Sequence, residues 1–245
     1  MNPTTLSRLL ELNREFYQTF ALQFSATRQR LQPGVLRVLE QVKPTDNILD
    51  LGCGNGELAR QLARRSHVGV YNGLDFSPTL FKQAAAGQPT NFHFLQADLS
   101  GTKWDATLQR EQYDIVLAFA VLHHLPGAEL RMQVLRKVKS LLRQGGRFIH
   151  SEWQFLNSPR LKARIQPWDA IGLSESDVDP GDYLLDWRQG GHGLRYVHHF
   201  SETELEQLAE AAGFRILETF LSDGENNRLG LYQLWQAKEY HHHIN

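Results

Sequence analysis

Three glycines alternate with other residues in a short segment that follows a strand-like run at 48–51. Residues 50–56 read Asp-Leu-Gly-Cys-Gly-Asn-Gly. Because glycine has no Cβ, a ligand can approach the backbone closely there. The spacing Gly-x-Gly-x-Gly differs from the Gly-x-Gly-x-x-Gly pattern, whose third glycine and helix N-terminus serve a pyrophosphate. The turn therefore favours a small-molecule site that is not built for a dinucleotide.

Two acids stand at the ends of the next two predicted strands. Asp75 could accept hydrogen bonds from both hydroxyls of a ribose, and the adjacent Phe76 could cover an adenine ring. Asp98 could accept a hydrogen bond from the adenine amino group. Ligands of open α/β sheets bind at the carboxyl ends of the strands. We therefore expect the glycine turn and both acids to converge on one adenosine-shaped cleft.

The elements that would position these residues alternate between strand and helix. Such alternation predicts an α/β fold with a mainly parallel, Rossmann-like sheet and helices on both faces. A long closing hairpin follows, with its turn at 222–227. The predicted strands are 48–51, 68–74, 92–95, 113–118, 147–152, 214–221 and 229–237, and a helix is predicted over about 128–142.

Two segments do not follow this alternation of strand and helix. Residues 4–24 predict a helix whose Phe16, Phe20 and Phe24 share one face, which favours core packing, and a second helix opens at Pro33. Residues 154–200 are an insertion that we call the lid, because a structureless loop of that length is unusual. Ser201 and Glu204 have the spacing of a capping box. We assign an N-terminal helical cap (1–44), a main domain (45–240) and a tail (241–245) that is excluded from the site.

The bulk composition is that of a globular protein. The chain has 245 residues, 41% hydrophobic and 22% charged, with net charge −1, so it has no overall attraction to nucleic acid or anionic membranes. A local basic face would still be sufficient for RNA. Cys53 is the single cysteine, which excludes an intrachain disulfide and argues against a cysteine-based metal site. No apolar run reaches the ~20 residues of a membrane helix, so the cytoplasm is the expected location.

The ordered motifs resemble class I S-adenosylmethionine (SAM) dependent methyltransferases. The match consists of residues 50–56, Asp75, residues 97–98 (Ala-Asp) and residues 119–125 (Phe-Ala-Val-Leu-His-His-Leu). The resemblance implies a seven-stranded sheet with an antiparallel last strand, SAM as cofactor and S-adenosylhomocysteine as product. The candidate cofactor-binding residues are Asp50, Gly52, Cys53, Gly54, Asn55, Gly56, Asp75, Phe76, Ser77, Asp98, Leu99, Phe119 and Ala120.

The residues available for chemistry restrict the methyl acceptor. Attack through a pyrimidine carbon needs a catalytic thiolate, but Cys53 is in the glycine turn. The Asn/Asp-Pro-Pro-aromatic motif of amine methylation is also absent. A carboxylate acceptor is ionised at neutral pH and needs no general base, only a cationic or donor group to aim it. Arg28, His123 and His124 could do that.

A closer, patchier resemblance is to tRNA methyltransferases that esterify a carboxymethyl group on wobble uridine. It rests on residues 24–28, 52–56, His123-His124 and residues 195–205, and it implies that Arg28 and one histidine of the pair meet the substrate. Arg28 could instead bind the SAM carboxylate or be a surface charge. One of the two histidines could pack or cap the following helix while the other faces the methyl group.

Charge leaves the acceptor class open between tRNA and a small molecule. A basic run on and after the 128–142 helix could follow a phosphate backbone, although such runs are usually solvated faces. Acids concentrated in the lid would repel RNA phosphates. The alternatives are a small-molecule O- or N-methyltransferase and a SAM-binding module without turnover. Whether a small activating subunit binds, and the oligomeric state, stay open. The acids are Asp169, Glu175, Asp177, Asp179, Asp182 and Asp186, and the basic residues are Arg131, Arg136, Lys137, Lys139, Arg143 and Arg147.

Overall fold

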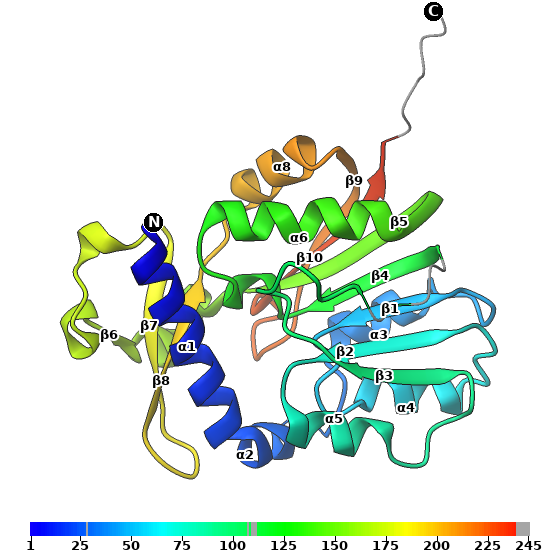
Figure 1. Cartoon of the computed structure of the whole chain (residues 1–245), viewed down its shortest axis with the longest axis horizontal. Helices are drawn as coiled ribbons and strands as arrows, with labels where there is room; N and C mark the ends of the chain where they lie inside the picture. The colour runs from blue at the N-terminus through cyan, green and yellow to red at the C-terminus, as the bar shows by residue number, and fades with distance from the viewer. Residues whose placement is uncertain (28, 107, 109–111, 239–245) are drawn as a thin grey trace, which may run out of the picture.

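A central seven-stranded sheet organises the molecule in the computed structural model, which describes residues 1–27, 29–106, 108 and 112–238 (Figure 1). The strand order is β3-β2-β1-β4-β5-β10-β9, and β10 runs antiparallel to both β5 and β9. The predicted sheet with its antiparallel last strand is thus confirmed. The bounds are β1 Ile48–Leu51, β2 Tyr71–Asp75, β3 Phe92–Gln96, β4 Tyr113–Phe119, β5 Leu142–Trp153, β9 Phe214–Ser222 and β10 Gly230–Ala237.

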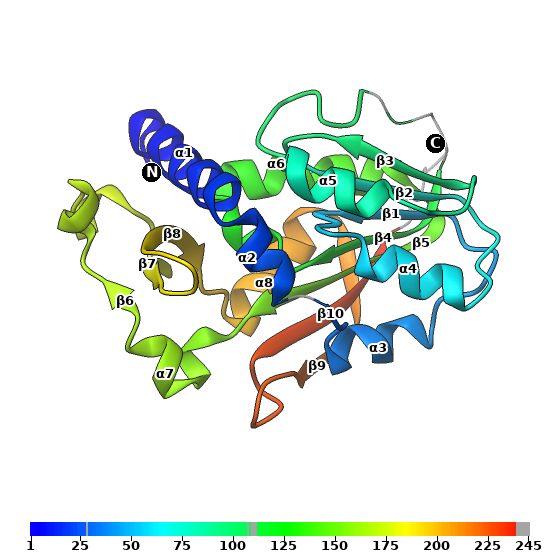
Figure 2. The ribbon, with the colours of Figure 1, turned by 90° about the horizontal axis from the view of Figure 1, so that it is seen from below.

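Helices cover both faces of this sheet (Figures 1 and 2). On one face lie α6 (Ala128–Leu141) and α8 (Glu202–Ala211), whose Val134 and Leu205 pack in one buried cluster with Phe148. On the other lie α3 (Pro33–Leu39) and α4 (Glu57–Arg64), which bury Val38 and Leu62. Next to β2 and β3 lies α5 (Pro78–Ala85).

The second strand begins later than its apolar pattern predicts. Val68 was expected to open it, but the strand begins at Tyr71 and Val68 is 67% exposed. The backbone N–H groups of Val68 and Gly69 both donate to the carbonyl of Pro44. These two hydrogen bonds hold Val68 and Gly69 outside the hydrogen-bonded ladder of the sheet.

The N-terminal helix is interrupted and lies along the lid rather than on the main sheet (Figure 1). The single helix predicted over 4–24 divides at Phe20, between α1 (Pro3–Thr19) and α2 (Ala21–Ala26). Phe16 and Phe20 are buried against Trp187, as core packing predicts, and the side chain of Phe24 lies outside the described part. Arg28 and the tail at 241–245 also lie outside the described residues.

The lid forms a small sheet of its own. Its strands β6 (Ile165–Gln166), β7 (Asp182–Trp187) and β8 (Gly193–His198) pair antiparallel, and a short helix α7 (Pro159–Lys162) precedes them. The Ser201 side chain caps α8 by accepting from the Glu204 N–H at 3.1 Å. The Glu204 carboxylate does not complete the capping box, since it binds His198 of β8 at 2.9 Å. That contact ties the lid to α8.

Within the part of the chain that the structure describes, no helix combines the length and apolar character that crossing a bilayer requires.

Candidate active site

The glycine turn between β1 and α4 combines unusual backbone angles with close packing. Gly52, Gly54 and Gly56 have φ of +71°, +57° and +79°, a region that side chains rarely adopt. A Cβ on Gly52 would meet Val121 at 2.7 Å, and one on Gly56 would meet Ala84 at 2.7 Å. A Cβ on Gly54 would meet nothing within 4 Å. Gly54 therefore leaves open space above its backbone for a ligand, whereas Gly52 and Gly56 pack closely against Val121 and Ala84.

A cavity of about 350 Å³ opens at the carboxyl ends of the central strands, within the size range of small-molecule sites. It contains most of the candidate residues, so the glycine turn and both acids converge as expected. Gly56 and Ser77 are the exceptions among the described candidates, and Ser77 instead caps α5. The candidates that line the cavity are Asp50, Gly52, Cys53, Gly54, Asn55, Asp75, Phe76, Asp98, Leu99, Phe119, Ala120, His123 and His124.

Asp75, at the end of β2, is held by the backbone of the cavity wall. One carboxylate oxygen accepts from Gly54 N–H at 2.9 Å and the other from Ser77 N–H at 2.8 Å. Burial raises the pKa of Asp75, and these backbone hydrogen bonds partly offset the increase. Since each carboxylate oxygen has a second lone pair, the group can still accept hydroxyl hydrogen bonds from a ligand.

Asp98 is tied to the N-terminal helix. It accepts from Arg14 Nε at 2.9 Å and from the Ser100 hydroxyl at 2.6 Å. Burial acts to raise the pKa of Asp98, but the hydrogen bonds from Ser100 and Arg14 lower it overall. The acid expected beside the adenine is thus ionised and fixed in place by α1.

Asp50 and Cys53 lie beneath the turn. Burial raises the pKa of Asp50 to about 7, although the Tyr71 hydroxyl donates to its carboxylate at 2.6 Å. Burial also raises the pKa of the Cys53 thiol well above its usual range, with a further contribution from Asp50. A thiol that is so difficult to ionise is a poor nucleophile.

A strained turn after β4 directs the histidine pair into the cavity. Ala120 has φ +57°, and its N–H donates to the carbonyl of Ser151 at 2.9 Å and to the Ser151 hydroxyl at 3.1 Å. Strained backbone persists only where its surroundings fix it. The short helix η1 (Leu122–His124) follows directly.

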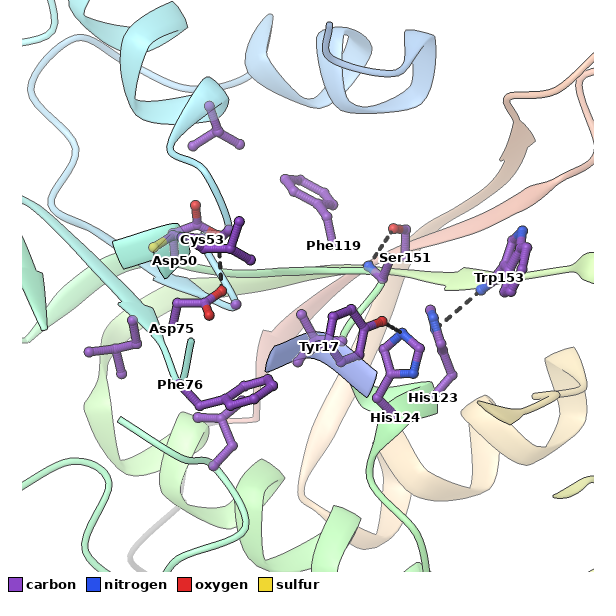
Figure 3. Close-up of a pocket in the computed structure, with 18 of the residues that line it drawn as sticks. Tyr17, Asp50, Cys53, Asp75, Phe76, Phe119, His123, His124, Ser151 and Trp153 are labelled. Atoms are coloured by element: carbon purple, nitrogen blue, oxygen red, sulfur yellow. Dashed lines mark hydrogen bonds between the residues drawn. The ribbon is translucent and has the colours of Figure 1, made fainter. Parts of the chain in front are cut away.

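His124 has a hydrogen-bond partner at each ring nitrogen. Its Nδ1 lies 3.4 Å from the Tyr196 carbonyl oxygen, which can only accept, so Nδ1 carries a proton. Its Nε2 lies 2.7 Å from the Tyr17 hydroxyl. The ring is therefore fixed from both sides, and Figure 3 shows the contact with Tyr17.

His123 belongs to a buried group that sequence reasoning missed. Its Nδ1 lies 2.9 Å from Glu152, and the other Glu152 oxygen lies 2.9 Å from His150 Nδ1. Burial raises the pKa of Glu152 well above its usual range and lowers that of His150 to about 3, which favours the neutral forms. Glu152 is an acid near the carboxyl end of β5, so the signal that identified Asp75 could have found it.

Arg195 of the lid also lines the cavity and was not a candidate. It is only 7% exposed, and its guanidinium lies 4.8 Å from the Trp153 ring centroid. Arg195 is the first residue of the 195–205 segment that carries the closer resemblance, but nothing in the sequence indicates that β8 faces the histidine pair.

The cavity has two distinct ends (Figure 3). We name them after the roles that the sequence analysis expects. The lining residues of the cofactor end are Asp50, Gly52, Cys53, Gly54, Asp75, Phe76 and Asp98. The lining residues of the acceptor end are His123, His124, residues 151–153 and Arg195. Tyr17 and Phe119 lie between the two groups in Figure 3.

Several charges expected at the surface are internal. Asp182 and Asp186 are 6% and 4% exposed; Asp182 binds His198 at 2.7 Å, and Asp186 binds Arg188 at 2.6 Å. Arg131 of the α6 basic run is 2% exposed and donates to the Leu125 carbonyl at 3.1 Å. The lid acids and the basic run therefore do not each form one solvated charged surface. Two of the six acids that were predicted to repel RNA phosphates are buried.

Comparison with known proteins assigns the chain to a family. The family model described as a methyltransferase domain matches residues 24–219. A tRNA (carboxymethyluridine(34)-5-O)-methyltransferase of Schizosaccharomyces pombe is 27% identical over 85% of this chain and 90% of its own. Its Saccharomyces cerevisiae counterpart is 32% identical over 58% of this chain and 48% of its own. A ubiquinone biosynthesis O-methyltransferase of Coxiella burnetii is 24% identical, covering 77% and 72% respectively.

Solved structures share the fold. One belongs to a Haloferax volcanii complex containing the Trm112 methyltransferase activator, with TM-score 0.68, 18% identity and coverage of 94% of this chain and 99% of that one. Another is a Burkholderia thailandensis 1,6-didemethyltoxoflavin-N1-methyltransferase with bound S-adenosylhomocysteine, with TM-score 0.63 and 18% identity over 98% of this chain and 92% of that one.

Proposed function

Because this chain belongs to the methyltransferase-domain family and is a SAM-dependent class I methyltransferase, we propose that it methylates an acceptor oxygen, namely the carboxylate of a carboxymethyl group on a tRNA wobble uridine. The observation that carries the proposal is the acceptor end itself. His123 and His124 are fixed by Glu152 and Tyr17 in the same cavity as the glycine turn. Rigidly held polar side chains of this kind suit the orientation of an acceptor group beside the cofactor.

The residues present fit SAM as the cofactor. Gly54 offers open backbone for the methionyl part, Asp75 has lone pairs for the ribose hydroxyls, and Asp98 lines the same cavity with a carboxylate that could accept from an adenine amino group. When bound, SAM supplies a methyl group activated by its sulfonium. The methyl group would pass to the acceptor oxygen, and S-adenosylhomocysteine would keep the electron pair of the broken carbon–sulfur bond. No proton has to move for a carboxylate, so the chain's task is to orient and desolvate the acceptor.

Two features favour oxygen over other acceptor atoms. Methylation through a pyrimidine carbon needs a thiolate, and Cys53 is buried in the cofactor turn with a raised pKa. The segment after β4 reads Ala-Val-Leu-His-His at 120–124 rather than the amine-methylating motif. A carboxylate acceptor is already ionised at neutral pH, so the fixed histidine pair has only to hold its oxygen in position.

The relatives divide between two acceptors. Both yeast relatives are tRNA carboxymethyluridine methyltransferases, whereas the Coxiella relatives methylate an oxygen in ubiquinone biosynthesis. A small-molecule O- or N-methyltransferase is therefore the second candidate. A SAM-binding module without turnover is the third.

The test is to follow methyl-labelled SAM into cellular tRNA and into small metabolites. We expect label in a wobble uridine, and mild alkali should release it as methanol because it is an ester. One arm supplies a Trm112-type activator, since a structural relative binds one. Alkali-stable label in a metabolite would instead support the second candidate, and bound SAM without any S-adenosylhomocysteine would support the third. Asp75→Ala is the control that lacks the cofactor contact.

A further inference from the structure

Arg195 is a buried cation whose position is fixed by aromatic rings from three elements. Its guanidinium carbon lies 4.8 Å from the ring centroid of Trp153, 5.2 Å from Phe16 and 5.6 Å from Trp187. These rings come from the end of β5, from α1 and from β7. Cation–π contacts stabilise the charge, but they do not engage the in-plane N–H donors of the guanidinium. The three rings therefore hold the charged group in one place.

The charge of Arg195 is permanent, whereas Glu152, which lines the same end of the cavity, favours its neutral form. Arginine stays protonated in proteins. Burial raises the pKa of Glu152 well above its usual range, and that carboxyl group is engaged by His123 and His150. His124 is held between the Tyr17 hydroxyl and the Tyr196 carbonyl. Arg195 thus contributes a permanent positive charge to the lining of this end of the cavity.

We propose that the Arg195 guanidinium binds a carboxylate group of the methyl acceptor and so selects anionic acceptors over neutral ones. The proposal rests on the proposed transfer to oxygen. A planar fork of N–H donors matches a carboxylate in shape as well as charge. One carboxylate oxygen is held by Arg195, and the other is the oxygen that receives the methyl group.

The alternative is that Arg195 only links α1, β5 and the lid. Arg195→Met separates the two roles, because methionine keeps a long apolar side chain among the three rings, and replacing a buried charge by an apolar residue is often neutral for stability. Arg160→Met is the matched control: Arg160 lies in α7 of the same lid, is exposed and does not line the cavity.

The experiment measures dissociation constants in the presence of S-adenosylhomocysteine for two probe pairs. One pair is 5-carboxymethyluridine and its amide, 5-carbamoylmethyluridine; the other is phenylacetate and phenylacetamide. We expect wild type and Arg160→Met to prefer each carboxylate over its amide by about 10- to 100-fold, the scale of a charge-assisted contact. Arg195→Met should lose that preference while its thermal midpoint and SAM affinity stay near wild type.

The outcomes separate the two proposals. A preference for the uridine carboxylate that Arg195→Met retains would overturn the role of Arg195 while leaving the proposed function in place. A preference for phenylacetate that depends on Arg195, without binding of either uridine, would overturn the tRNA acceptor and support Arg195. Absence of any carboxylate preference in wild type would overturn the inference. An Arg195→Lys variant with the full wild-type preference would also overturn it, because the planar guanidinium would then not be needed. If Arg195→Met unfolds, Arg195→Gln, which keeps hydrogen-bond donors but no charge, replaces it in the same comparison.

Discussion

Single side chains set the cofactor end, and Asp75 is the clearest case. Its two oxygens accept from backbone N–H groups of the glycine turn and of the residue that caps α5, so the same carboxylate shapes the turn and lines the cavity.

Asp75→Ala should weaken SAM binding at least tenfold, because hydrogen bonds to a charged acceptor contribute about 1.5–3 kcal/mol each. Calorimetry measures the affinity directly. Glu40→Ala removes an exposed acid outside the cavity and should bind SAM like wild type. Unchanged affinity in Asp75→Ala would remove the carboxylate from the ribose site.

The histidine pair should act on turnover rather than on cofactor binding. His123→Ala and His124→Ala are each expected to lower kcat while SAM affinity changes little, since both rings lie at the acceptor end. Tyr17→Phe should reproduce part of the His124→Ala loss, because it removes the hydroxyl bonded to Nε2 at 2.7 Å. Stopped-flow or single-turnover methyl transfer separates these effects. Full activity in both histidine variants would exclude the pair from the mechanism.

Asp50 makes stability depend on pH. Its pKa in the folded protein is about 7, above the ~3.9 of an unfolded chain, so the folded state holds an extra proton between these values. Its contribution to stability is complete below about pH 4 and is lost as pH rises towards 7, by up to ~1.4 kcal/mol per pH unit. Asp50→Asn should remove this dependence. Denaturant unfolding of both proteins from pH 4 to 8 measures it, and parallel curves would contradict the assignment.

At the scale of elements, α1 is docked by one buried amide. Asn13 Nδ2 donates to the carbonyls of His124 and Tyr196 at 3.1 and 3.2 Å, and its Oδ1 accepts from the Tyr196 N–H at 2.9 Å. The side chain thus connects α1, η1 and β8, which are three of the elements around the acceptor end.

Asn13→Ala should lower the free energy of unfolding by about 1–3 kcal/mol, because it leaves a buried N–H and two carbonyls without their partner. The same change should increase proteolytic cleavage within α1. Gln18→Ala, on the exposed side of α1, is the control and should change stability by less than about 0.5 kcal/mol. Equal effects of the two substitutions would show that the amide does not anchor the helix.

The sequence pattern predicts the main sheet well and the lid poorly. Alternating apolar runs and the turn glycines locate β1, β4 and the closing hairpin, because local periodicity determines which face of each element is buried. The Phe20 break, the late start of β2 and the three lid strands depend on contacts between distant segments, such as the Pro44 carbonyl that holds Val68. The site follows the same rule. Asp75 stands at a predictable strand end, whereas Arg195 reaches the cavity only because the lid folds against α1.

At the scale of the whole molecule, the net charge of −1 requires any tRNA binding to come from local contacts. Binding should still weaken with salt, by about tenfold or more between 50 and 200 mM for a few phosphate contacts. Fluorescence anisotropy of labelled tRNA over that range measures the slope. A complex that is insensitive to salt would favour a small-molecule acceptor.

The long separation between Asn13 and Tyr196 has a consequence for synthesis. These residues are 183 positions apart, so α1 leaves the ribosome long before its docking strand exists. Until β8 is made, the aromatic side of α1 has no native surface to cover it and is open to chaperones and proteases. The end of the cavity that Arg195 lines is therefore among the last parts of the enzyme to assemble, and a nascent chain that stalls before the lid has the glycine turn but lacks β8.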